Sequence, residues 1–233
     1  MIRSTLITSD MKNVIIGETC LLRYQLERVG IKNDSTNIFD DMKVNLAGVT
    51  KIVKNNFSDL LSSELIERVN YLYYPEHGIR HNKPINRKYT LNDDSLYSWD
   101  VCCFFHFDVE TPEAYASLAR KAERTKAIFE SDDEVILFYY YRPHSKYNVP
   151  KLKQKLDEFL LFLEDKYNKC FKAVLITQEQ CDDNAVEING EGSKLIHGHF
   201  KTRDSWVGID DNWDGHSNND LFDFLFTRIK DYV

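Results

Sequence analysis

The segment EVILFYYYR, residues 134–142, leaves few folds open to this chain. It is the most continuous apolar run in the sequence, and such a run is typical of a strand that is buried on both faces. Strands of this kind lie at the centre of parallel sheets, whose two faces are covered by helices. A long amphipathic segment follows it, and one helical face is marked by Leu152, Leu156, Phe159, Leu160, Leu163 and Tyr167.

Short apolar runs alternate with amphipathic segments along most of the chain. The patterns predict further strands over residues 13–17, 99–107, 171–177 and 193–200. They predict further helices over residues 20–29, 42–57, 58–72, 112–129 and 219–233, with Gly30 closing the first and Ser58 capping the third. Residues 73–95 are polar, contain two prolines and have no period, so we expect a long loop there.

This alternation predicts an α/β fold in a single domain over residues 1–233. We expect a doubly wound, mostly parallel sheet with helices on both faces, and a papain-like α+β fold is the alternative. In doubly wound sheets the functional site lies in the strand-to-helix turns beyond the carboxyl ends of the strands.

Composition narrows the classes of partner and cofactor. The net charge of −7 argues against nucleic-acid and membrane partners, both of which need a concentrated basic surface. No export signal and no transmembrane run is apparent, so the five cysteines are expected to be reduced thiols in the cytoplasm. We expect no metal, because C-x-x-C pairs are missing, and no nucleotide cofactor, because the phosphate-binding glycine motifs are missing. The sequence does not indicate an oligomeric state.

The first turn, Gly17–Cys20, carries the strongest candidate for chemistry. Cys20 lies where a helix begins, with Thr19 as a plausible N-cap, and helix N–H groups there stabilise a thiolate. The same N–H groups can hold an oxyanion during acyl transfer, and Gly17 permits close approach of a substrate. The alternative is that Cys20 is a small buried hydrophobic residue.

A cysteine nucleophile needs a base, and the sequence offers two. His106 precedes Asp108 by two residues, so on a strand both side chains would share one face as a base and its orienting carboxylate. Asp214 and His216, just before the last helix, form an alternative pair. His197 and His199 could share a face and bind a metal, but no third ligand is evident, so we interpret them as part of a strand.

Five motifs in order resemble a bacterial family of predicted papain-like cysteine peptidases. They are IIGETCLLRYQLERVG, IFDDM, FFHFD with the arginine-containing RKAERTKAIF, VILFYYYR, and WVGIDDNW. The resemblance implies that Cys20 is the nucleophile and His106 the base, and that Asp108 departs from the family's adjacent His-Asp pair. IFDDM keeps Asp40 but loses the family's tryptophan. In a papain fold, the helix that carries the cysteine does not directly follow a strand of a parallel sheet. The strand predicted at residues 13–17 therefore favours the doubly wound sheet.

The leading hypothesis is a cysteine-dependent acyl-handling enzyme, a hydrolase or an acyltransferase acting on a small-molecule, acyl or peptide substrate. In this hypothesis Glu18, Arg23 and Asp40 join Gly17 and Thr19 as substrate-binding or supporting residues. The competing hypothesis is a non-catalytic accessory protein of polysaccharide or secondary-metabolite assembly, with a structural Cys20.

Overall fold

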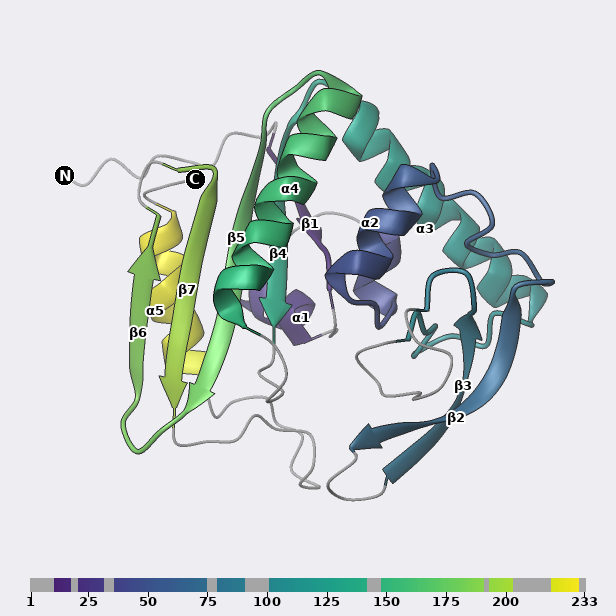
Figure 1. Cartoon of the computed structure of the whole chain (residues 1–233), viewed down its shortest axis with the longest axis horizontal. Coiled ribbons are helices and arrows are strands. Elements are labelled where there is room, and N and C mark those ends of the chain that lie inside the picture. The colour runs from purple at the N-terminus through teal and green to yellow at the C-terminus, as the bar shows by residue number, and fades with distance from the viewer. Residues whose placement is uncertain are drawn as a thin grey trace. The chain divides into compact units, whose positions relative to one another are not determined.

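The computed structural model describes residues 11–17, 21–31, 36–74, 79–90, 101–141, 148–190, 193–202 and 219–230 (Figure 1). The chain divides into two compact units, the first of residues 1–13, 21–34 and 132–233, the second of residues 14–20 and 35–131. Each unit is described by itself below, and the expectation of a single domain stays a prediction. Within the described ranges, no helix is long and apolar enough to cross a membrane.

A five-stranded, mostly parallel sheet forms the centre of the first unit. Its strands are β1 (Met11–Ile15), β4 (Glu134–Tyr141), β5 (Phe171–Gln180), β6 (Ala185–Asn189) and β7 (Leu195–Thr202), in the order β1-β4-β5-β7-β6. β5 pairs parallel with β4 and with β7, and β6 pairs antiparallel with β7 at the edge. The apolar run at residues 135–141 is buried throughout, which confirms it as an interior strand of an α/β sheet.

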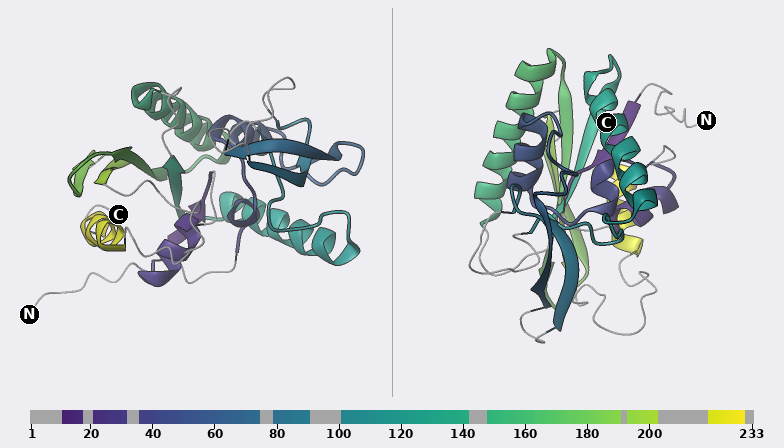
Figure 2. Two further views of the ribbon diagram at one scale, coloured as in Figure 1. Left: turned by 90° about the horizontal axis from the view of Figure 1, so that it is seen from below. Right: turned by 90° about the vertical axis from the view of Figure 1, so that its right-hand side faces the viewer.

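Helices cover both faces of this sheet. Figure 2 shows α4 (Val149–Tyr167) on one face and α1 (Leu21–Arg28) with α5 (Asn219–Ile229) on the other. The predicted leucine and phenylalanine face of α4 is buried. On the opposite face Gly198 of β7 leaves room for Leu225 of α5, because a Cβ at this glycine would lie 2.6 Å from the leucine side chain. The predicted doubly wound arrangement is therefore the observed one.

The second unit consists of shorter elements around two helices and a hairpin. A 3-10 helix η1 (Ile38–Asp41) precedes α2 (Leu46–Lys54), and the long helix α3 spans Pro112–Glu130. Asn45 and Thr111 cap the two α-helices, and Pro112 occupies the first turn of α3 as predicted. The strands β2 (Ile66–Tyr74) and β3 (Ile79–Asn86) pair antiparallel.

The predicted helix over residues 58–72 is wrong. The predicted loop over residues 73–95 is wrong at residues 73–74 and 79–86, which form strands, whereas residues 75–78 and 91–95 lie outside the described residues. Three non-glycine residues with positive φ, Asn56, Phe57 and Asp59, turn the chain just after α2, so no helix begins at Ser58. The segment IERVNYLYY instead pairs with IRHNKPIN as a hairpin. The spacing of the apolar residues in the first segment fits a helix as well as a strand. The segment is a strand because it pairs with the polar segment IRHNKPIN.

Two further differences concern short strands. Residues 101–107 do not form the predicted strand; Cys103 makes only isolated bridges, one to Lys43 and one to Ile85. This segment therefore contacts the backbone at Lys43 and at Ile85, and it is buried from residue 101 to residue 104. β6 was not predicted, because its sequence AVEIN is short and only moderately apolar. Trp99 and Asp100 lie outside the described residues.

Candidate active site

A strand and a helix flank the predicted nucleophile in the sequence, as predicted. Val14, Ile15 and Ile16 are buried, and Gly17 has a φ of +147°, a conformation that favours glycine. α1 begins at Leu21, so Cys20 immediately precedes the first helical residue. Glu18, Thr19 and Cys20 lie outside the described residues, and their roles stay predictions.

The predicted supporting residues Arg23 and Asp40 have defined partners. The Nε atom of Arg23 donates to Glu27 Oε1 over 2.7 Å, one turn further along α1. Asp40 is 1% exposed, and its carboxylate accepts from the backbone N–H and the side-chain amide of Asn37 at 2.9 and 2.8 Å. These contacts form a capping box that fixes the start of η1. Contact of either residue with a substrate stays a prediction.

The segment that carries the predicted base is held in place by ion pairs and cation-π contacts. Lys121 of α3 pairs with Asp41 of η1, and its ammonium lies 4.5 Å from the ring centroid of Phe107. Arg68 of β2 reaches the carboxylates of Asp108 at 2.6 Å and Glu110 at 2.7 Å. The hydrogen bond from Arg68 to Glu110 is the main cause that raises the pKa of this guanidinium.

His106 itself is exposed and lies edge-on to Phe105, with 5.1 Å between the ring centroids. Phe105 also contacts His81 of β3, at 5.6 Å between centroids, and the Lys83 ammonium, at 5.1 Å from its centroid. Burial, followed by the charges of Lys83 and Lys43, lowers the pKa of His81. Two imidazoles therefore contact the same phenylalanine, and one of them, His81, was not considered as a base because it fell in the predicted loop.

The arrangement of Asp108 differs from the sequence expectation. The argument that His106 and Asp108 share a face depended on a strand, and residues 105–108 do not form one. The Asp108 carboxylate pairs with Arg68, and its backbone oxygen accepts from the N–H of Thr111, the cap of α3. Arg68 was missed because its segment was predicted to be helical. The role of Asp108 in orienting His106 stays a prediction.

Four of the five cysteines lie within the described residues and differ in accessibility. Cys102 and Cys103 are fully buried, which agrees with the interpretation that they pack in the core. Burial, then the neighbouring Cys103, raises the pKa of the Cys102 thiol well above the ordinary range. Cys170 is exposed, and the half-buried Cys181 donates to the backbone oxygen of Asp183 over 2.9 Å.

The histidine pair of the sheet lies on β7, as predicted for a strand. Both rings contact one hydroxyl, since Thr177 Oγ1 is 2.8 Å from His197 Nε2 and 2.8 Å from His199 Nδ1. Among the described residues, no group of three or more histidine, cysteine, aspartate or glutamate side chains is placed to hold a metal ion. The alternative base pair, Asp214 and His216, lies outside the described residues.

Comparison with protein-family models gives one match, over residues 11–181. The model is described as "Putative papain-like cysteine peptidase (DUF1796)". The matched range contains Cys20, His106 and Asp108, and it ends before His197 and His216. No curated protein and no solved structure matches the chain.

Proposed function

Because the chain belongs to this family of papain-like cysteine peptidases, we propose that it is a cysteine-dependent acyl-handling enzyme with Cys20 as its nucleophile. The observation that carries the proposal is the place of Cys20. It lies inside the family match, after a buried strand and a positive-φ glycine, and directly before α1. A thiol at a helix N-terminus has its thiolate stabilised by the helix dipole and by unpaired N–H groups.

The other cysteines are weaker candidates. Cys102 and Cys103 are sealed from solvent, and a buried thiol with a raised pKa provides almost no thiolate. Cys170 follows the carboxyl end of α4, so no helix N-terminus supplies N–H groups to it. Cys181 already donates its hydrogen to the backbone oxygen of Asp183.

The base is proposed to be His106. A catalytic pair that belongs to the family must lie within residues 11–181, which favours His106 over His216. His106 is exposed, so its ring can meet a substrate, and it is held in a segment anchored on both sides by Lys121 and Arg68. His81 shares its aromatic neighbour and provides a matched control for variants.

The chemistry follows from these two groups. His106 takes the Cys20 proton, and the thiolate attacks the substrate carbonyl, whose oxygen becomes an oxyanion held by N–H groups at the start of α1. The carbonyl reforms as the bond to the leaving group breaks, and His106 returns the proton to that group. The resulting thioester on Cys20 then passes its acyl group to water or to an amine or hydroxyl acceptor, and the thiol is restored. We propose that this activity is cytoplasmic and that its substrate is an acyl compound or a peptide.

An acyl-trapping experiment tests the proposal. We expect that a short incubation with excess p-nitrophenyl acetate adds one acetyl group to the protein, and that peptide mapping by mass spectrometry places it on Cys20. The His106→Ala variant should acylate slowly, whereas His81→Ala should acylate at the rate of the unaltered protein. Acetylation spread over Cys170, Cys181 and surface lysines, with Cys20 unmodified, would support the non-catalytic accessory role instead.

A further inference from the structure

Four side chains of the five-stranded sheet form a continuous hydrogen-bonded chain that the proposed cysteine chemistry does not use. Thr177 lies between the two histidines, at 2.8 Å from His197 Nε2 and 2.8 Å from His199 Nδ1. The other nitrogen of His199, Nε2, is 3.2 Å from Glu179 Oε2. The chain therefore runs His197–Thr177–His199–Glu179.

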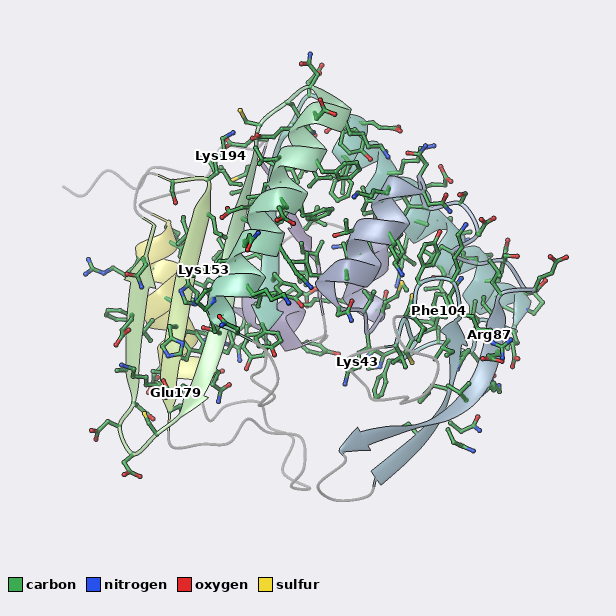
Figure 3. The ribbon with its side chains drawn as sticks, viewed as in Figure 1. Lys43, Arg87, Phe104, Lys153, Glu179 and Lys194 are labelled. Carbon is green, nitrogen blue, oxygen red and sulfur yellow. The ribbon has the colours of Figure 1, made fainter. Side chains whose placement is uncertain are left out.

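The register of the sheet places this chain on the face that α4 covers. Leu175 pairs with His197 and Thr177 with His199 across the parallel strands β5 and β7. Gly198 and Phe200, which alternate with the histidines, contact α5 on the opposite face. In Figure 3 the labelled Lys153 of α4 and Glu179 of β5 lie on the α4 side of the sheet.

The donor and acceptor roles along this row of four hydrogen-bonded side chains can be assigned by starting from Glu179. An ionised carboxylate only accepts, so His199 carries a hydrogen on Nε2 and, when neutral, accepts at Nδ1. The donor at Nδ1 is then the Thr177 hydroxyl. Thr177 has a single hydrogen, so towards His197 it can only accept, and His197 must carry its hydrogen on Nε2. This assignment leaves His197 Nδ1 as a buried acceptor, and it has no hydrogen-bond partner among the described residues.

We propose that His197, Thr177 and His199 form one proton-binding unit, in which proton uptake at His199 reverses the hydrogen bonds and moves the His197 hydrogen from Nε2 to Nδ1. A proton added to His199 Nδ1 turns that nitrogen into a donor to Thr177. The Thr177 hydrogen then points to its other partner, His197 Nε2, which must become an acceptor. His197 loses its Nε2 hydrogen to solvent and gains one at Nδ1, so the unit takes up one proton in total.

The surroundings disfavour a charge at His197. Glu179 contacts His199 directly, whereas burial, then the charges of Lys153 and His199, lowers the pKa of His197 to about 4. The ring centroids are 6.0 Å apart, so a second charge would be close to the first. The titratable or charged groups that face the pair are Glu179 from β5, Glu187 from β6, Lys201 from β7, Lys153 from α4 and, by register, Tyr141 from β4.

The neutral and the protonated states of the unit differ in the hydrogen-bond partner that the buried His197 Nδ1 requires. In the neutral state His197 Nδ1 is an acceptor without a partner. In the protonated state it carries a hydrogen that needs an acceptor, and the ammonium of Lys153, the charged group from α4, can only donate. We therefore expect proton uptake to weaken the packing of the first turns of α4 on the sheet, whose strand β5 contacts this helix.

NMR of protein labelled with ¹⁵N-histidine tests this inference. In the full chain at about pH 8 the His197 nitrogen shifts should report the Nε2–H form. On lowering the pH, the His197 signals should change to the Nδ1–H form with the same midpoint as the protonation of His199. Amide exchange of the first turns of α4 should accelerate over the same range. Thr177→Ser keeps the hydroxyl and should keep this coupling, whereas Thr177→Val removes it, and the two titrations should separate.

Two results would overturn the inference. One is a His197 tautomer that stays unchanged in the unaltered protein while His199 takes up its proton. The other is coupling that persists in Thr177→Val. If Thr177→Val does not fold, the unaltered protein and Thr177→Ser still decide the question, because both must show a common midpoint. None of these readouts depends on the reactivity of Cys20.

Discussion

Replacing Cys20 with alanine should lower the hydrolysis of p-nitrophenyl acetate or of a simple acyl thioester by a factor of about 10⁴ to 10⁶. The expected loss is large because the variant has no nucleophile to form the acyl-enzyme, and the remaining N–H groups and base only assist a slow attack by water. Steady-state turnover of the purified variant and of the unaltered protein measures the effect.

Cys170→Ala provides the control for this substitution. Cys170 is exposed and is not part of the proposed site, so turnover should stay within about twofold of the unaltered protein. Denaturation curves of both variants should match those of the unaltered protein, which separates loss of chemistry from loss of folding. A Cys20→Ala variant that keeps most of the turnover would exclude the proposed nucleophile.

The second large effect concerns stability and its dependence on pH. The pKa of His197 is lowered from 6.5 to about 4, mainly by burial. Between these values the unfolded chain binds a proton that the folded protein does not, so stability falls as the pH drops from about 6.5 to about 4. The shift corresponds to a free energy of the order of 3 kcal/mol, present above pH 6.5 and lost by about pH 4.

Urea denaturation of His197→Gln at several pH values measures this contribution. Glutamine does not titrate, so the variant lacks the decline that His197 causes. Its destabilisation relative to the unaltered protein should therefore shrink by the order of 3 kcal/mol between pH 7 and pH 4. Parallel pH profiles for His197→Gln and the unaltered protein would show that burial of His197 does not oppose its protonation.

The central strands and helices were predictable because their patterns are long and agree with the local preferences of the chain. β4 is a continuous buried run, and α4 carries a complete apolar face between an asparagine cap and Asn168, which adopts the left-handed conformation at its end. β5 then repeats the pattern of an interior strand. Each of these elements could be predicted from its own sequence pattern, without knowledge of the elements that pack against it.

The hairpin of the second unit could not be read in the same way. β3 contains Arg80, His81, Asn82 and Lys83 as well as Pro84, so neither its polarity nor its proline indicates a strand. It is a strand because β2 pairs with it, and that pairing depends on a turn whose position the sequence does not reveal. The same reasoning applies to residues 101–104, which are buried by bridges to two separate segments.

The candidate sites also differ in whether the sequence alone could predict them. The strand and the helix on either side of Cys20 could be predicted from the sequence alone, because an apolar run, a glycine and an amphipathic segment follow one another there. The chain of hydrogen bonds through Thr177 could not, because it depends on the register between β5 and β7, strands separated by β6 in the sequence. A histidine pair spaced by two on a strand indicates a shared face, but not what lies opposite.

The central claim is that Cys20 is a reactive thiolate activated by an imidazole, and its pH profile of alkylation tests this most directly. The rate of Cys20 modification by iodoacetamide, followed by mass spectrometry of the Cys20 peptide, should give an apparent pKa well below the ordinary value of about 8.5. His106→Ala should move this midpoint upward, and His81→Ala should leave it in place. A midpoint near 8.5 in the folded protein, unchanged by His106→Ala, would contradict the account.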